Sequence, residues 1–317
     1  MYSTLNNIGL IGALKPLIQN ERILVSGASG WLGKNLIELI LDLNDGEIPE
    51  SVLLTATSSR TIELSHNRKV EVVKWDREAI QAFAPTTFIN LAFLTRDRLL
   101  TIPVDQYIQT NLSIIDNAIW ALSLPSINLV LSTSSGVASA ISNVDDFQID
   151  PYGKLKKYEE LVLSEKADEL KKKLLILRVW TVSGKYIKPG DLLIIQSIIS
   201  AALANKDFEI SSKSLTYRTY IHTYEMFGLA LVGLLNGKTG IINSGGIKVE
   251  IADLAQRIFT LLNAKARVIQ VLDRKESTEQ YVSISPELNE VAVKFKISMM
   301  DLDSQILNTA ESIRELS

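Results

Sequence analysis

The chain has 317 residues, of which 46% are hydrophobic and 22% are charged, a balance typical of a globular protein rather than a disordered or fibrous one. Its 33 basic and 36 acidic residues give a net charge of −3 without a basic run, which argues against a nucleic-acid partner. There is no cysteine and there are only two histidines, His66 and His222, which excludes disulfides, thiolate chemistry and a histidine-rich metal site.

In chain order, short apolar runs typical of buried strands alternate with longer amphipathic segments. The expected strands are residues 22–26, 52–56, 70–73, 87–92, 128–132 and 174–179. A helix is expected after the first strand, and two longer helices over 105–122 and 152–173. Apolar strands separated by helices predict an α/β fold with a doubly wound parallel sheet covered on both faces. No apolar run reaches the ~20 residues of a membrane-spanning helix, so we expect a cytoplasmic protein without a membrane partner.

Three glycines, Gly27, Gly30 and Gly33, separate the first expected strand from the first expected helix. In this context the first glycine permits a tight turn, the second lets a pyrophosphate approach the backbone, and the third lets helix and strand pack closely. The helix N-terminus then offers free N–H groups to an anion. The segment therefore predicts a dinucleotide-binding turn of the Rossmann type rather than a plain packing turn. Its other expected cofactor-binding residues are Ser29, Trp31 and Leu32.

Tyr152 and Lys156 lie at i and i+4 on one face of the expected helix 152–173. A lysine cation beside a phenol, with a nicotinamide cation nearby, favours the phenolate and lowers the tyrosine pKa, which makes the tyrosine a usable acid or base near neutral pH. Ser134 follows the strand 128–132, and we expect it to point into the crevice at the carboxyl ends of the strands and to hydrogen-bond a substrate oxygen. Taken alone, these features are also compatible with a surface helix and a polar turn.

Together and in this order, these features resemble the extended branch of the short-chain dehydrogenase/reductase family, which uses NAD or NADP and acts largely on nucleotide sugars. The resemblance covers nearly the whole chain. Further segments similar to family motifs are 90–93, 178–184, 218–226 and 242–246.

The resemblance implies a dinucleotide-binding Rossmann domain over 1–180, to which 219–244 returns. It implies a smaller, discontinuous substrate-binding lobe over most of 181–317. Because extended members commonly dimerise by pairing the helices 105–122 and 152–173, we expect a homodimer.

The resemblance also implies roles for individual residues. The expected catalytic residues are Ser134, three residues before Val137, with Tyr152 and Lys156. Beyond the glycine turn, the expected cofactor contacts are Asp76, Leu91, Ala92, Phe93, Asn111, Tyr152 and Lys156. The expected substrate contacts are Ser135, Thr181 and Arg218.

The chain departs from the family pattern at the positions that define the 4,6-dehydratases. There an Asp-Glu pair follows the catalytic hydroxyl, whereas here Ser135 and Gly136 follow Ser134. Without that acid and base, elimination of water loses its catalysts, so we expect no 4,6-dehydratase activity. Thr181 also replaces an asparagine that usually contacts the nucleotide pyrophosphate, although Arg218 can still hold a phosphate.

The end of the second expected strand bears on the choice of cofactor. NAD-specific members place an acid there to hold the ribose hydroxyls. Here the strand runs into Ser58 and Arg60 with no carboxylate, and a guanidinium suits a 2′-phosphate. We therefore favour NADP over NAD, the alternative being a solvated arginine in a loop.

The function expected from these observations is reduction or epimerisation of a keto nucleotide sugar at its 4-position, with Tyr152 as proton donor or acceptor. Two alternatives stay open. One is a reductase of a small non-sugar ketone or aldehyde, because Thr181 weakens the sugar-nucleotide signature. The other is a regulatory protein that binds the dinucleotide without turnover.

Overall fold

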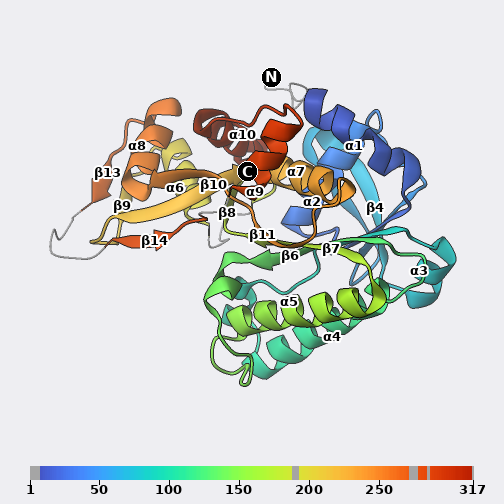
Figure 1. The fold of residues 1–317 in the computed structure, drawn as a ribbon. Coiled ribbons are helices and arrows are strands. Elements are labelled where there is room, and N and C mark those ends of the chain that lie inside the picture. Colours follow the sequence, from blue (N-terminus) through green and yellow to red (C-terminus); the bar gives the residue numbers. More distant parts are fainter. Residues whose placement is uncertain (1–7, 188–192, 271–277, 284–285, 316–317) are drawn as a thin grey trace.

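The computed structural model describes residues 8–187, 193–270, 278–283 and 286–315. Its largest feature is an eight-stranded sheet of order β11-β7-β6-β5-β1-β2-β4-β3 (Figure 1). The strands are β1 Ile23–Ser26, β2 Val52–Ala56, β3 Arg60–Glu63, β4 Lys69–Lys74, β5 Thr87–Asn90, β6 Leu129–Ser135, β7 Lys173–Val179 and β11 Gly240–Asn243. All pairings are parallel except that of β3 with β4. The expected doubly wound α/β fold is therefore confirmed.

The strand order reverses at β1, because the chain proceeds to β2 on one side and later to β5 on the other. In an open parallel sheet, ligands bind outside the carboxyl ends of the strands at such a reversal. Every side chain of β1 and β5 is buried, which fits central strands covered on both faces. The reversal therefore places the candidate site beside the glycine turn that follows β1.

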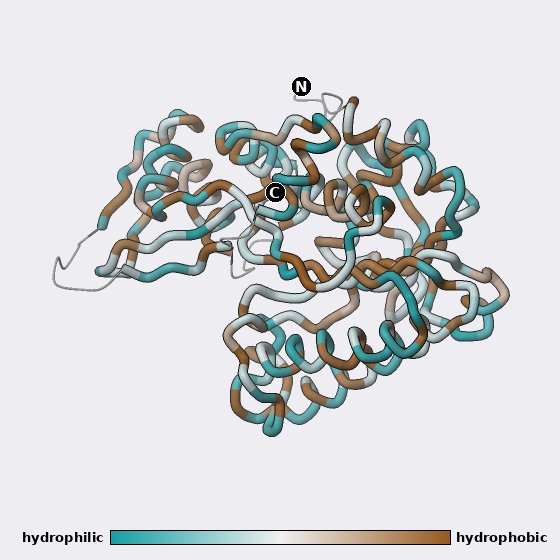
Figure 2. Tube along the Cα trace, in the orientation of Figure 1, coloured by the Kyte–Doolittle hydropathy of each residue, from teal (hydrophilic) through white to brown (hydrophobic). Residues whose placement is uncertain are grey.

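Helices cover both faces of this sheet. One face carries α3 Arg77–Phe83, α4 Val104–Leu122 and α5 Pro151–Leu170, and the other carries α1 Ile8–Asn20, α2 Trp31–Leu43, α7 Thr223–Leu235 and α9 Glu287–Lys294 (Figure 1). Figure 2 shows hydrophobic residues concentrated in the strands between these two layers. α7 is buried along almost its whole length, because α1, α2 and α9 enclose it.

A second, smaller sheet lies to one side, with order β12-β10-β14 and with β8 also paired to β10. Its strands are β8 Thr181–Ser183, β10 Thr216–His222, β12 Ile247–Glu250 and β14 Glu279–Tyr281. Around it lie α6 Ile194–Leu203, α8 Ile251–Leu261 and α10 Leu302–Glu315, with the short pair β9 Phe208–Ile210 and β13 Val268–Gln270. A hydrophobic cluster separate from that of the large sheet joins these helices to β10.

The register of the second sheet brings β8 and β14 to the same edge of β10. Thr181 is paired with Tyr220, and Tyr281 is paired with Arg218, while β12 occupies the opposite edge. We propose that the boundary between the two units falls near residue 180, where β7 of the large sheet passes into β8 of the small one, with α7 and β11 returning to the large unit.

Several expected boundaries move. Arg60, for which a loop position was the alternative, opens the edge strand β3, and α1 precedes the first expected strand. The strand expected over 87–92 ends at Asn90, and the one expected over 128–132 continues to Ser135. The helix expected to reach residue 173 ends at Leu170, because Lys171 adopts a left-handed conformation with φ of 53°. In the described part of the chain, no helix has the length and apolar character needed to cross a membrane.

Candidate functional site

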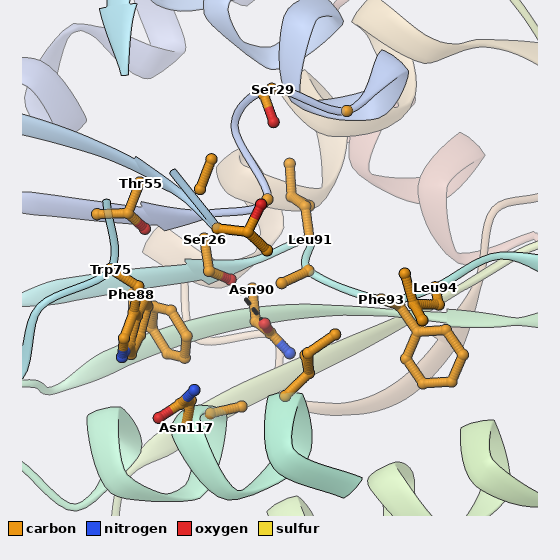
Figure 3. Close-up of a pocket in the computed structure, with 17 residues that line it drawn as sticks. Ser26, Ser29, Thr55, Trp75, Phe88, Asn90, Leu91, Phe93, Leu94 and Asn117 are labelled. Carbon is orange, nitrogen blue, oxygen red and sulfur yellow. Dashed lines mark hydrogen bonds between the residues drawn. The ribbon is translucent and has the colours of Figure 1, made fainter. Parts of the chain in front are cut away.

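A cavity of about 230 Å³ opens at the carboxyl ends of β1, β2 and β5 and is closed on one side by α4 (Figure 3). Trp75 and Phe88 lie at one end of this cavity and Phe93 and Leu94 at the other. No charged side chain lines it among the described residues. The lining residues are Ser26, Gly27, Ser29, Gly30, Thr55, Ala56, Thr57, Trp75, Phe88, Asn90, Leu91, Ala92, Phe93, Leu94, Ile114, Asn117 and Ala118.

The glycine turn forms the wall nearest α2. Gly27 has a φ of 71°, and a Cβ on it would lie 2.7 Å from the backbone nitrogen of Ala92, so only glycine fits there. A Cβ on Gly33 would lie 2.5 Å from the carbonyl oxygens of Gly27 and Ala28, which explains the close packing of α2 on the turn. Gly30 precedes α2 without a side-chain cap, so the first N–H groups of this helix remain available to an anion.

The cavity fits a dinucleotide. It is long, it begins at a helix N-terminus, and its walls are apolar with a few hydroxyl and amide groups. At one end the buried indole Nε1 of Trp75 has no hydrogen-bond partner among the described residues, so this donor is left for a ligand. Six of the expected cofactor contacts line the cavity: Gly27, Ser29, Gly30, Leu91, Ala92 and Phe93.

The other expected cofactor contacts lie outside the lining. Trp31 and Leu32, at the start of α2, are partly buried and pack against the hydrophobic core of the large sheet. Asp76 caps α3 by accepting a hydrogen bond from the Ala79 N–H at 2.8 Å. Asn111 is fully buried and accepts a hydrogen bond from the Leu94 N–H at 2.8 Å, so it holds the loop that ends the cavity.

Ser58 and Arg60 lie beside a second, polar hollow rather than in the main cavity. Arg60 donates a hydrogen bond to the Ser58 hydroxyl at 2.5 Å, and both residues are exposed. The hollow also contains the side chains of Lys34 and Lys69, and Ser29 of the glycine turn lines both spaces. Three cations therefore gather next to the turn, although Glu63 and Glu71 also line this hollow.

Tyr152 stands near the start of α5, at the Phe93 end of the cavity. The two rings meet edge to face with their centroids 5.9 Å apart. Burial raises the pKa of Tyr152 above its ordinary value, while a hydrogen bond with Ser135 lowers it. The lowered pKa expected from Lys156 is thus not the net direction in this structure, because burial dominates.

Lys156 is buried one helical turn beyond Tyr152. Its ammonium donates to the Thr133 carbonyl oxygen at 3.0 Å and to the Glu159 carboxylate at 2.9 Å, and it lies 3.7 Å from the centre of the Phe93 ring. Tyr152 and Lys156 therefore both lie at one end of the cavity. The Phe93 ring separates their side chains from the rest of the cavity.

The two serines of β6 have different surroundings. The Ser134 hydroxyl is buried without a hydrogen-bond partner in the described part of the chain. The Ser135 hydroxyl accepts a hydrogen bond from the Val137 N–H at 3.3 Å and also shares hydrogen bonds with Tyr152 and Tyr281. Side chains alternate along a strand, so only one of two consecutive serines faces Tyr152. The structure brings Ser135, expected as a substrate contact, to the place expected for Ser134.

A further hollow lies in the smaller unit, next to the junction of β7 and β8 at Trp180. Trp180 and Tyr281 line it with their ring centroids 4.7 Å apart, and the Arg218 guanidinium, 5.7 Å from the centre of the Tyr281 ring, pairs with Glu279 at 2.7 Å. Thr181 lines this hollow, and its buried hydroxyl has no partner among the residues described. Tyr281 was not expected, because no motif surrounds it in the sequence. Over the described ranges, no group of three or more His, Asp or Glu side chains is arranged to hold a metal ion.

Comparison with known proteins agrees with this architecture. Residues 23–245 match the NAD dependent epimerase/dehydratase family, so the chain belongs to that family, as its resemblance to the extended short-chain dehydrogenase/reductases indicates. No curated protein matches the sequence significantly.

Solved structures share the fold at low sequence identity. A UDP-N-acetylglucosamine 4-epimerase from Methanobrevibacter ruminantium, in complex with UDP-N-acetylmuramic acid, has a TM-score of 0.72 and 17% identity over 94% of this chain and 99% of that chain. UDP-glucose 4-epimerase from Thermotoga maritima with UDP-glucose has a TM-score of 0.68 and 16% identity over 93% and 99%. A dTDP-glucose 4,6-dehydratase from Bacillus anthracis in complex with NAD has a TM-score of 0.68 and 15% identity over 92% and 96%.

Proposed function

We propose that the protein is an NAD(P)-dependent reductase or epimerase that acts at the 4-keto position of a nucleotide sugar. The observation that carries this proposal is the position of Tyr152. Its ring meets Phe93 of the dinucleotide cavity edge to face, and its hydroxyl shares the Ser135 hydroxyl with Tyr281, which lines the hollow beside Trp180. A substrate in that hollow would have its reacting oxygen beside an acid and its ring beside the cofactor cavity.

The residues of this chain divide the work as follows. When bound, the dinucleotide would donate a hydride to the substrate carbon or accept one from it. Gly27, Gly30 and the N-terminus of α2 would hold its pyrophosphate. Tyr152 would pass a proton to or from the substrate oxygen, and the Ser135 hydroxyl would orient that oxygen. Ser134 is the catalytic residue expected from the sequence, and its buried hydroxyl has no hydrogen-bond partner among the described residues. It would take part in the reaction only if a bound ligand formed a hydrogen bond with it.

A second candidate is a reductase of a small carbonyl compound without a diphosphate. The observation that favours it is the ion pair between Arg218 and Glu279, which neutralises the expected phosphate-binding guanidinium. Thr181 in place of an asparagine points the same way. Both candidate functions use the same dinucleotide cavity and Tyr152, so only the choice of substrate separates them. The panel of substrates described below contains nucleotide hexoses and small ketones. A dinucleotide-binding regulatory protein would turn over none of the panel.

We expect no dehydration of thymidine, uridine or guanosine diphosphate hexoses. An acid and a base would have to follow the site hydroxyl, and a side chain on Gly136 has no room, because a Cβ there would lie 2.6 Å from the Trp180 ring and 2.8 Å from the Tyr281 hydroxyl. The protein should instead oxidise NADPH when given a 4-keto-6-deoxy nucleotide hexose, or convert a nucleotide hexose to its 4-epimer with NAD.

The measurement is NMR of each sugar product together with absorbance at 340 nm. Formation of a 4-keto product from a parent hexose would contradict this proposal and require an acid and base from elsewhere in the chain. Turnover of small ketones alone would select the second candidate.

We also propose NADP as the preferred cofactor. The support is the uncharged lining of the main cavity together with Arg60, Lys34 and Lys69 around the adjoining hollow. NADPH should bind more tightly than NADH, and Arg60→Ala should narrow the ratio of dissociation constants by about tenfold, since a charge-assisted contact with a phosphate is lost. Calorimetric titration with both dinucleotides measures this, and Arg267→Ala, a remote exposed arginine, is the control. Equal affinities in the wild type would refute the preference.

We further propose a cytoplasmic homodimer formed through α4 and α5, as the family resemblance implies. These two helices pack side by side against the sheet, and Leu161 of α5 is 47% exposed although it is a large apolar residue. Sedimentation equilibrium of the wild type and of Leu161→Glu tests the pairing. The dimer of the charged variant should dissociate at a higher protein concentration than the wild-type dimer.

A further inference from the structure

Glu159, on α5, is a buried carboxylate with no part in the proposed reaction. It is 2% exposed. One carboxylate oxygen accepts a hydrogen bond from the Lys156 ammonium at 2.9 Å, and the other accepts one from the Asn90 side-chain amide at 2.9 Å. The Asn90 amide oxygen in turn accepts from the Ser26 hydroxyl at 2.7 Å (Figure 3). A buried chain of hydrogen bonds therefore runs from Ser26 at the end of β1, through Asn90 of β5, to the lysine one helical turn from Tyr152.

The contacts of Lys156 show what Glu159 does to it. An ammonium has three N–H donors. Here one is directed to Glu159, one to the Thr133 carbonyl oxygen, and the Phe93 ring covers the amine at 3.7 Å. A buried ammonium without a counter-ion is strongly unfavourable, so the carboxylate both compensates the charge and fixes its position.

The next residue along the helix provides a natural comparison. Glu160 is also buried, at 1% exposed, but it faces the neighbouring strand and forms two hydrogen bonds of 2.7 Å with the Arg178 guanidinium. The two adjacent buried carboxylates on α5 therefore serve different cations: Glu159 serves Lys156, whereas Glu160 serves Arg178, with the Lys157 ammonium 3.8 Å away. Only Glu159 is connected to the Tyr152 and Lys156 pair.

We propose that Glu159 is a positioning residue for this pair: it holds the Lys156 ammonium in place and offsets the charge that the ammonium presents to the Tyr152 hydroxyl. The proposal rests on the proposed function only in taking Tyr152 as the group that exchanges the proton. Asn90 completes the arrangement by directing the second carboxylate oxygen away from Lys156.

The charges around Tyr152 agree with this role. After burial and the Ser135 hydrogen bond, the Glu159 carboxylate has the largest effect on the pKa of Tyr152, and it raises that pKa. The other groups that face the hydroxyl come from several elements. They are Arg96 of the turn Arg96–Leu100, Asp150 at the start of α5, Tyr107 of α4 and Tyr281 of β14, while Lys156 lies one helical turn further along α5. Arg96 lowers the pKa of Tyr152 and Asp150 raises it, each less than Glu159 does.

The test is a spectrophotometric titration of the Tyr152 phenolate in the full-length protein, isolated by subtracting the curve of the matching Tyr152→Phe variant. Glu159→Gln removes a unit charge two helical turns, about 10 Å, from Tyr152. At an effective dielectric constant of about 20, the Tyr152 midpoint should fall by about one pH unit. Glu160→Gln, the matched control, should shift the midpoint less, because the Glu160 carboxylate is held by the Arg178 guanidinium and does not bond Lys156.

A second variant guards against misfolding of Glu159→Gln. Lys156→Met combined with Glu159→Gln removes both buried charges at once, so it leaves no charge uncompensated. If the two charges offset each other at Tyr152, this double variant should titrate close to the wild type. An unchanged midpoint in Glu159→Gln, an equal shift in Glu160→Gln, or a shift in the double variant as large as that in Glu159→Gln would each overturn the proposal. Because the titration uses no substrate, a failure of the proposed reaction would not alter its outcome.

Discussion

Replacing Tyr152 with phenylalanine is expected to lower turnover by about 10²–10⁴-fold while leaving dinucleotide affinity nearly unchanged. Phenylalanine keeps the ring that packs edge to face on Phe93, so the end of the cavity keeps its shape. It loses the hydroxyl that hydrogen-bonds Ser135 and that would exchange the proton. Steady-state rates with the keto sugar and calorimetry with the dinucleotide measure the two effects separately.

The matched control for this variant is Tyr158→Phe. Tyr158 lies on the same helix but packs against Phe147, outside the site, so its hydroxyl should be dispensable. Serine variants then locate the partner hydroxyl: Ser135→Ala should reduce turnover more than Ser134→Ala, because only Ser135 bonds with Tyr152. A Tyr152→Phe enzyme that kept more than about a tenth of the wild-type rate would show that another group donates the proton.

The parts of the fold that could be predicted from sequence are those with a strong local signal. The central strands are apolar throughout, and the glycine turn has a spacing that few other structures require. The edge strand β3 lacks such a signal, because Ile62 is its only buried residue. The helix α1 lacks an acidic first turn and a basic last turn and contains Pro16, so nothing in its sequence marks where it begins or ends.

In the candidate site, too, the features with a local sequence signal could be predicted and those set by tertiary packing could not. The i and i+4 spacing of Tyr152 and Lys156 needs only a helix, so the sequence reveals that they share a face. Which of two consecutive serines faces Tyr152 depends on the exact register of β6 against α5, and that is a property of tertiary packing. Tyr281 reaches the site only because β14 pairs with β10, far away in the sequence.

Glu159 could not be distinguished from the solvated charges of a lysine- and glutamate-rich helix. Such a segment normally indicates an exposed face. Its burial follows from the way α5 packs over the ends of β5 and β6, where Asn90 and Thr133 provide polar contacts. The one sequence feature that could have indicated a buried partner for Lys156 is the pair Glu159 and Glu160. These residues lie three and four positions after Lys156 and therefore on the same side of the helix.

Replacing Lys156 with methionine is expected to impair both catalysis and folding. Turnover should fall by about 10²-fold or more, because the cation beside Tyr152 and the expected contact with the nicotinamide ribose are both lost. The free energy of unfolding should fall by about 3–5 kcal/mol, because Glu159, only 2% exposed, is left as a buried charge without its counter-ion. Adding Glu159→Gln should restore most of the stability but not the turnover, which separates the structural role of the pair from its chemical one.

The pH dependence of the single variant gives an independent check. Burial raises the pKa of Glu159 and Lys156 lowers it, so removing the lysine raises that pKa further. A carboxyl whose pKa is higher in the folded than in the unfolded state stabilises the fold below its unfolded pKa of about 4.3, and that stabilisation is lost as the pH rises through the folded value. Lys156→Met should therefore be more destabilised at pH ~8 than at pH ~5.5, whereas the double variant should show no such difference. Urea unfolding at both pH values measures this, and a single variant equally stable at the two would mean that Glu159 is not the buried charge that Lys156 compensates.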